Sequence, residues 1–337
     1  MGKVKLSDIA KEANVSIALV SYVLNNRLPE RIKKETAERI KEIAKKLNYT
    51  PNQLAKGLRT QKSNAIGLIL ADLANPFSAQ IARIIEDNVI GSDYILLIGS
   101  MDESSTKFQK LVDTFINHHV DGLIIVSPEN VKNEIKKIQS QGIPYVLVDR
   151  YFPELSFNFV GNDNYFSTYE CVKRLVANGR KSIGFITHDT NYFHFLERKR
   201  GFVEACEAFD LDNTKIVEVG FSDFNTNVAH AMSTLLAQNP DVDAVLFATG
   251  VLALHGLKYA IRNELDVPAK IEIMGFDKAD YYDIFPAPIA YYEQPLEEIG
   301  KKAVDFLMQE IANPGAQFIQ EIVRGSVKVA EPLAIRK

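Results

Sequence analysis

Short apolar strand patterns alternate with helical patterns from Ala65 onward, and this alternation constrains the fold of the 337-residue chain more than any other feature. The runs lack polar alternation, which is typical of strands buried on both faces of a parallel sheet. The expected strands are Ile66–Ala71, Tyr94–Gly99, Gly122–Val126, Tyr145–Asp149, Ser182–Thr187, Val217–Phe221, Ala244–Thr249 and Ile271–Phe276. The helical stretches between them are 78–90, 104–118, 131–141, 166–178, 195–209, 226–238 and 251–264. One compact open sheet with a single switch point would not hold this many strand and helix units. The sequence therefore predicts an α/β body of two lobes.

The first sixty residues differ from this body in charge. Residues 1–62 hold 14 Lys and Arg against 6 Asp and Glu, whereas the remaining 275 residues hold 25 against 37. A basic module joined to an acidic body indicates a nucleic-acid-binding head. A solvated basic helix face fits the same charges.

Three helical patterns fit into this basic segment, at Leu6–Ala13, Ile17–Leu24 and Lys34–Leu47. Ser16 stands where it can cap the second helix, and the short turn before it is typical of a helix-turn-helix. The second helix of such a motif reads base edges in the major groove, and short polar groups beside it contact phosphates. The expected DNA contacts are therefore Ser16, Ile17, Ala18, Ser21, Tyr22 and Asn25. Other small three-helix bundles share the pattern.

A short helical segment, Gln53–Arg59, follows the third helix and is too short to be stable alone in water. Ala55 permits close approach to DNA, Lys56 supplies charge, and Leu58 can wedge into a base step. An ordinary flexible linker is the alternative.

The head resembles the lac repressor family (LacI/GalR) in densely spaced motifs. These are Ser7-Asp8-Ile9-Ala10, Ala13-Asn14-Val15-Ser16, Val20-Ser21-Tyr22-Val23-Leu24-Asn25, Glu35-Thr36, and Tyr49-Thr50-Pro51-Asn52 followed by Ala55 and Leu58. The resemblance implies that 53–59 is a hinge helix, paired in a dimer in the minor groove with Leu58 intercalated. Two departures are a longer loop at Asn26–Lys33 and a recognition helix without arginine or glutamine. Direct readout should therefore depend on thymine methyl contacts and Tyr22.

The resemblance extends over the body and implies two lobes like those of periplasmic binding proteins. The expected organisation is a helix-turn-helix domain at 1–50, a hinge helix and linker at 51–63, and an effector-binding and dimerisation body at 64–337. Lobe one covers about 64–162 and 293–323, and lobe two about 163–292 and 324–337. The chain should cross between them near Gly161–Asn164, Tyr291–Pro295 and Ile322–Ser326.

Ligands of α/β sheets bind beyond the carboxyl ends of the strands, where this sequence places carboxylates, arginine and aromatic residues. Such a mixture suits saccharides, since it bonds hydroxyls and packs against sugar rings. The resemblance points to Phe77, Asp149, Arg198, Phe221 and Asp277 in particular. The expected effector contacts are Phe77, Asp149, Arg150, Arg198, Phe221, Thr249 and Asp277. At Thr249-Gly250 relatives commonly carry Asn-Asp or Asn-Asn, which puts a simple monosaccharide in doubt.

The sequence thus predicts a cytoplasmic DNA-binding transcriptional regulator, a repressor by expectation, that binds a pseudo-palindromic double-stranded operator as a homodimer. Its effector is expected to be a saccharide. A purine, another metabolite or a protein co-regulator is the alternative, and a sugar-binding protein or sugar-modifying enzyme is a remote one. No phosphate loop, nucleophile elbow or metal motif is visible, so neither an enzyme nor a cofactor is expected. His118-His119 lacks metal-site geometry, and no apolar run is long enough to span a membrane.

Overall fold

The computed structural model describes residues 4–25, 27, 29–49, 62–221, 223–315 and 317–333. Contacts within the chain divide it into two units, Met1–Ser63 and Asn64–Lys337. Each unit is considered by itself.

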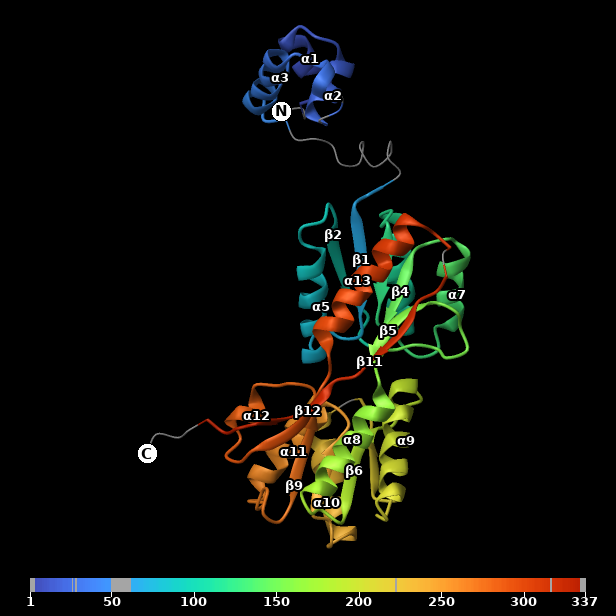
Figure 1. The fold of residues 1–337 in the computed structure, drawn as a ribbon, viewed down its shortest axis with the longest axis vertical. Helices are drawn as coiled ribbons and strands as arrows, with labels where there is room; N and C mark the ends of the chain where they lie inside the picture. Colours follow the sequence, from blue (N-terminus) through green and yellow to red (C-terminus); the bar gives the residue numbers. More distant parts are fainter. Residues whose placement is uncertain are drawn as a thin grey trace. The chain divides into compact units, whose positions relative to one another are not determined.

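The head is a small three-helix unit, drawn in blue in Figure 1. It consists of α1 (Leu6–Ala13), α2 (Ile17–Leu24) and α3 (Lys34–Lys46), which confirms the three helices predicted from the sequence. The Ser16 side chain accepts a hydrogen bond from the amide of Leu19 at 3.2 Å and so caps α2. A 3₁₀ turn at Pro29–Arg31 lies in the longer loop before α3. The buried side chains of the head are Ile9, Ala10, Ala13, Val20, Val23, Ile40 and Ala44.

The body contains two six-stranded sheets, one in each lobe. In lobe one the order is β11-β5-β4-β3-β1-β2, and the paired strands are all parallel. These strands are β1 (Ala65–Leu70), β2 (Ile95–Ser100), β3 (Gly122–Ile125), β4 (Tyr145–Val148), β5 (Asn158–Asn162) and β11 (Gln320–Val323). Because the strands run parallel, their carboxyl ends meet at one edge of the sheet.

Lobe two repeats this design with the order β12-β10-β9-β8-β6-β7. Its strands are β6 (Ile183–His188), β7 (Ile216–Val219), β8 (Ala244–Phe247), β9 (Glu272–Phe276), β10 (Ile289–Glu293) and β12 (Ser326–Ala330). The pairs are parallel except for β12, which runs antiparallel to β10 at the edge.

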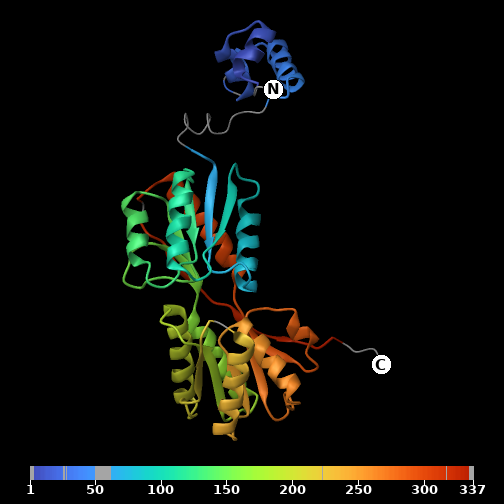
Figure 2. The same cartoon turned by 180° about the vertical axis from the view of Figure 1, so that it is seen from behind.

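Helices cover both sheets, and Figure 2 shows them from behind. Lobe one carries α5 (Pro76–Val89), α6 (Ser105–Asn117), α7 (Lys132–Ser140) and α13 (Leu296–Ala312). Lobe two carries α8 (Asn164–Ala177), α9 (Phe193–Ala208), α10 (Phe224–Gln238), α11 (Gly250–Arg262) and the short α12 (Tyr281–Ile284). Helix α5 packs beside α13, and α8 beside α9.

All eight expected strands are present, but the structure adds β5, β10, β11 and β12. These four lie beside the points where the chain passes between the lobes, from β5 to α8, from β10 to α13 and from β11 to β12. Helix α13 was also absent from the sequence-based expectation. The extra strands have weak patterns of their own, as in the Asn158–Asn162 segment, and they form because a neighbouring strand offers a partner.

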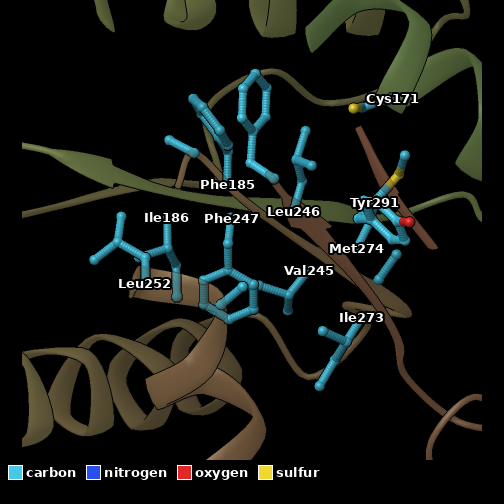
Figure 3. Packing of buried hydrophobic residues seen from close by; sticks show 14 of the residues in the cluster. Cys171, Phe185, Ile186, Val245, Leu246, Phe247, Leu252, Ile273, Met274 and Tyr291 are labelled. Atoms are coloured by element: carbon cyan, nitrogen blue, oxygen red, sulfur yellow. The ribbon is translucent and has the colours of Figure 1, made fainter. Parts of the chain in front are cut away.

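Each lobe has its own hydrophobic core. Figure 3 shows part of the core of lobe two, where side chains from β6, β8 and β9 pack together. There the ring of Phe185 stacks on that of Phe202 from α9, with centroids 4.9 Å apart. This packing fixes α9 on the sheet. It therefore positions the residues in the first part of α9, which belong to the candidate site.

Candidate functional site

The recognition helix α2 presents apolar side chains to solvent. Ile17 is 53% exposed and Tyr22 40% exposed, and Ala18 is exposed beside them. Exposed apolar groups on a small basic domain fit contacts with thymine methyl groups. Ser21 is half-buried, and Asn25 donates from its side-chain amide to the Ser21 carbonyl at 2.7 Å.

Four further DNA contacts were expected, one at the start of α2 and three in the 53–59 segment. Ser16 is exposed and its hydroxyl caps α2, so it lies at the helix end that enters a groove in such motifs. Ala55, Lys56 and Leu58 lie outside the described residues.

In the body, most of the expected effector contacts come together between the lobes. Asp149 follows β4 of lobe one, whereas Arg198 on α9 and Asp277 after β9 belong to lobe two. The charges of Arg198 and Asp277 both act on Asp149. We call Asp149, Arg198 and Asp277 the central cluster. It lies at the carboxyl ends of the two sheets, as expected for a ligand site of this architecture.

Arg198 is held rigidly in this cluster. Its Nε donates to Asn164 Oδ1 at 2.8 Å, its Nη1 donates to the carbonyl of Ala248 at 2.6 Å, and the guanidinium lies 3.8 Å above the Phe276 ring. The residue is 3% exposed. Burial lowers the pKa of the guanidinium, although the charges of Asp277 and Asp149 oppose that shift. A planar, preorganised cation of this kind suits recognition of hydroxyl or carboxylate oxygens.

A glycine allows this placement of α9. A Cβ built on Gly201 would lie 2.3 Å from the carbonyl oxygen of Tyr165 in α8, so any larger residue would push the two helices apart. The close approach brings Arg198 to Asn164 at the start of α8.

The two carboxylates of the central cluster differ in their surroundings. Asp277 accepts from Gln294 Nε2 at 2.6 Å and from the amide of Gly250 at 3.2 Å, so both of its oxygens are engaged. Asp149 is buried, and burial raises the pKa of its carboxyl despite the opposing charges of Arg198 and Arg150. Burial thus disfavours the charged form of the Asp149 carboxyl, and such perturbed carboxyl groups are common at functional sites.

Of the other expected contacts, Phe221 and Thr249 both lie against His188 of lobe two, whereas Phe77 belongs to lobe one. The Phe221 ring stacks on His188, with centroids 4.4 Å apart and planes 7° from parallel. Thr249 caps α11 through Leu252, and its hydroxyl lies 3.4 Å from His188 Nε2. Phe77 packs against the core of lobe one at the start of α5.

Within the described residues, buried polar atoms without a hydrogen-bond partner concentrate in this region. Most of them belong to residues at strand ends, in loops or at the start of α9, namely Arg150 Nε, Asn162 Nδ2, Thr187 Oγ1, His188 Nδ1, His194 Nδ1 and Gln294 Oε1. Buried polar groups in folded proteins are otherwise nearly always bonded. The concentration of these unbonded polar atoms between the lobes therefore indicates a site for a polar ligand.

An ion pair of lobe one meets a tyrosine of lobe two beside the cluster. Arg150 forms two hydrogen bonds with Glu103, at 2.6 and 2.7 Å, and its guanidinium lies 4.2 Å above the Tyr192 ring. The Tyr192 hydroxyl donates to Glu103 at 2.6 Å. Burial alone would raise the pKa of Glu103, but the hydrogen bonds and charge of Arg150 lower it. Arg150 is thus committed to this ion pair, and its Nε alone lacks a partner.

A second carboxylate of lobe one, Glu129, extends the connection. Its Oε1 accepts from the hydroxyl of Thr190 and from the amide of Asn191, the latter at 3.0 Å. Its own amide donates to the Tyr192 hydroxyl at 3.1 Å. We call Glu103, Glu129, Arg150, Thr190 and Tyr192 the interlobe latch. These bonds hold the lobes together at one side of the cleft.

Several residues of the site were missed or left open by the sequence. His188 and His194 were not among the expected effector contacts; both are buried, and burial lowers the pKa of His188 to about 4. Glu103 and Glu129 follow β2 and β3, so the same rule of strand ends would have found them. Asn164 gives no comparable signal, because its role depends on α9 lying against α8.

In the parts of the chain that the structure describes, no three His, Cys, Asp or Glu side chains are grouped as metal ligands. Among the same residues, no helix combines the length and apolar character needed to cross a membrane.

Comparisons with known proteins agree with this architecture. Residues 63–324 match the family model described as periplasmic binding proteins and sugar binding domain of LacI family, and residues 5–52 match bacterial regulatory proteins, lacI family. The transcriptional repressor CytR of Escherichia coli is 28% identical over 333 residues, 96% of each chain. The ribose operon repressor of Haemophilus influenzae is 28% identical over 316 residues, 93% of each chain.

Solved structures show the same fold. A lac repressor dimer bound to operator and an anti-inducer aligns with a TM-score of 0.86 at 22% identity, over 99% of this chain and 100% of that one. A complex of the regulator CelR with cellobiose aligns with a TM-score of 0.73 at 23% identity, over 98% and 99%. The chain belongs to the LacI family and is a DNA-binding transcriptional regulator with a helix-turn-helix head and a two-lobed α/β body.

Proposed function

We propose that this regulator is a cytoplasmic repressor whose affinity for a pseudo-palindromic operator is set by a small effector bound between the lobes. The central cluster, together with the buried polar atoms of the described residues that lack hydrogen-bond partners, is the observation that carries the proposal. The effector shifts the balance between two lobe arrangements, and this shift reaches the DNA-binding head.

The parts of the chain divide this work. Residues 1–50 recognise the operator, 51–63 form the hinge and linker, and 64–337 bind effector and dimerise. Within the head, Ser16, Ile17, Ala18, Ser21, Tyr22 and Asn25 contact DNA, together with Ala55, Lys56 and Leu58 of the hinge. Within the body, the effector contacts are Phe77, Asp149, Arg150, Arg198, Phe221, Thr249 and Asp277.

A saccharide is the effector class that the chemistry favours. Carboxylates and a fixed arginine can bond hydroxyls, and the Phe221 ring offers a flat apolar surface above His188. The names of relatives support this class, since one is a ribose operon repressor and a structural neighbour is bound to cellobiose. The residues of the cleft suggest binding rather than turnover, and the relatives are named as regulators, so we propose that the protein is not an enzyme.

Dimerisation would cover an apolar edge of lobe one. Strand β2 ends the sheet, and on it Ile95 is 60% exposed and Ile98 45% exposed, with exposed Leu73 in the loop after β1. An exposed apolar edge strand invites pairing with another chain. A second copy of this chain, as in the lac repressor dimer to which the fold is similar, is the proposed partner.

A ligand screen followed by one substitution tests the proposal. Saccharides, sugar phosphates and purines are added to the full chain in a thermal-shift assay, and binding to a duplex selected from random sequence is followed by fluorescence anisotropy. A ligand at about 100 times its Kd should stabilise the protein by roughly 2.7 kcal/mol. Arg198→Ala should abolish this shift and the effector response while the selected duplex still binds.

Two outcomes would contradict the proposal. Normal effector response of Arg198→Ala would remove the central cluster from the ligand site. A hit among purines alone would replace the saccharide by another effector class, with the regulator itself unchanged.

A further inference from the structure

We propose that Tyr292 is a positioning residue for lobe movement, because its hydroxyl joins all three segments in which the chain passes between the lobes. These segments, which we call the crossings, run from β5 to α8, from β10 to α13 and from β11 to β12. The inference deepens the proposed function and rests on it in one respect, since the arrangement of the lobes is taken to set operator affinity.

The Tyr292 side chain belongs to the second crossing, since it lies one residue before the end of β10. Its hydroxyl donates to Asn162 Oδ1 of the first crossing at 3.3 Å and accepts from the amide of Gly325 in the third at 2.7 Å. We call these two hydrogen bonds the crossing contact. One oxygen atom thus joins segments that lie 130 and 33 residues away along the chain.

The crossing contact is buried and its tyrosine ring is fixed. Tyr292 is 0% exposed, and its ring stacks on that of Phe276 in β9 with centroids 5.3 Å apart. Burial raises the pKa of the Tyr292 hydroxyl, so the group keeps its proton and can donate. A Cβ built on Gly325 would collide with the carbonyl oxygen of Glu293, so only glycine lets the third crossing approach the second this closely.

Tyr292 also supports two members of the central cluster. Its carbonyl accepts from the amide of Asp277 at 2.9 Å. Its ring lies against that of Phe276, and the Arg198 guanidinium lies 3.8 Å from the Phe276 ring centroid. A displacement of Tyr292 would therefore move groups that are expected to contact the effector.

The first crossing reaches the central cluster by a separate route. Asn164 Nδ2 donates to the carbonyl of Asn162 at 3.0 Å, and Asn164 Oδ1 accepts from Arg198 Nε at 2.8 Å. The Asn162 Nδ2 atom is buried and has no hydrogen-bond partner within the described residues. The bond from the Tyr292 hydroxyl therefore orients the Asn162 side chain.

An ion pair near the surface connects the first and third crossings as well. Arg324 Nε donates to Asp163 Oδ2 at 2.9 Å, and the guanidinium lies 4.2 Å from the Phe166 ring centroid. The Arg324 side chain is 62% exposed, and exposed ion pairs contribute little to stability. The buried crossing contact is therefore the stronger constraint.

Rotation of one lobe against the other changes backbone dihedral angles within the crossings. While the Tyr292 hydroxyl joins the three segments, they have to turn together. Without it, the Gly325 amide and Asn162 Oδ1 lose their partner in this arrangement of the lobes. Since unpaired buried polar groups are unfavourable, arrangements in which water reaches these atoms become more populated.

The test measures distances between the lobes of the full chain by double electron–electron resonance. Spin labels at Lys136→Cys in α7 and Lys181→Cys before β6 report on the two lobes, because both lysines are exposed. Cys171 and Cys206 are buried and stay unlabelled. Dilution with unlabelled chain restricts the signal to distances within one protomer. Tyr292→Phe should raise the ratio of other lobe arrangements to the wild-type one about tenfold, as expected for two lost hydrogen bonds.

Tyr282→Phe is the matched control for this substitution. Tyr282 is also 0% exposed, but its hydroxyl donates within lobe two, to the carbonyl of Phe276 at 3.0 Å. Both variants lose a buried hydroxyl, so urea unfolding should show a similar loss of stability, whereas only Tyr292→Phe should alter the distances. Asn162→Ala, which releases the first crossing alone, gives a second reading should Tyr292→Phe fold poorly.

The outcomes separate this inference from the proposed function. Unchanged distances in Tyr292→Phe, or equal changes in both tyrosine variants, would overturn the role of the crossing contact. Affinity for the selected duplex is then measured by anisotropy. Altered distances with unaltered operator affinity would support the crossing contact and contradict control of DNA binding by the arrangement of the lobes.

Discussion

A single carboxyl group, Asp149, is kept in surroundings that disfavour its charge, because burial outweighs the attraction of Arg198 and Arg150. Its pKa is raised in the folded protein. Below the unfolded-state pKa of about 4 the group is protonated in both states. As the pH rises, the unfolded chain releases its proton first, and the folded state loses stability until the pH passes the raised pKa.

We therefore expect Asp149→Asn to raise the free energy of unfolding at pH 7 and to leave it nearly unchanged at pH 3. Asparagine tolerates the left-handed backbone of this position, where φ is 64°. The same substitution should weaken effector binding, because asparagine is a weaker hydrogen-bond acceptor for effector hydroxyls than the Asp149 carboxylate. Urea unfolding at both pH values measures the difference, and an equal change at pH 3 and pH 7 would refute the linkage.

At the scale of elements, the Tyr192 hydroxyl contributes two of the hydrogen bonds by which the interlobe latch stabilises lobe closure. Tyr192→Phe removes the group that donates to Glu103 and accepts from the amide of Glu129. Hydrogen bonds to charged groups contribute about 1.5–3 kcal/mol, so open arrangements should become more populated. Without effector, the radius of gyration in small-angle X-ray scattering should increase. Tyr169→Phe, in α8 of lobe two, is the control and should leave the radius unchanged, whereas no change in Tyr192→Phe would refute the latch.

The recognition helix supplies another test at this scale. Tyr22 is exposed on α2, and its ring is expected to contact base edges. Tyr22→Ala should weaken binding to the selected operator by about tenfold, since one base contact accounts for roughly 1–3 kcal/mol of discrimination. Binding to an unrelated duplex should change little, because phosphate contacts dominate there. Equal losses of affinity for both duplexes, measured by anisotropy, would mean that Tyr22 contacts the DNA backbone and not the bases.

At the scale of the whole molecule, operator binding should depend on pairing of two copies through β2. Ile98→Asp places a charge on the apolar edge and should shift the protein from dimer to monomer in sedimentation velocity. Operator affinity should also fall, because a monomer does not bind both half-sites of the operator at once. Leu196→Asp, at an exposed position of α9, is the matched control. A dimer that survives Ile98→Asp would place the interface elsewhere.

Part of the site could be predicted from the sequence because strand ends are readable. Asp149, Thr249 and Asp277 lie at or just after the ends of expected strands, Asp149 at the carboxyl edge of the lobe-one sheet and the other two at that of lobe two. Arg198 was found through the family resemblance. By contrast, the burial of His188 and the commitment of Arg150 to Glu103 depend on neighbours far away in the chain.

The sequence by itself determined the three helices of the head, the alternating α/β body and the separation of a basic module from an acidic one. These features follow from periodicity, capping residues and charge, which are local properties. Only the tertiary structure decided where β5, β10, β11 and β12 form and how the latch joins the lobes. Such features form where segments with weak sequence patterns contact residues far away in the chain. The free energy of those contacts cannot be read from any single stretch of the sequence.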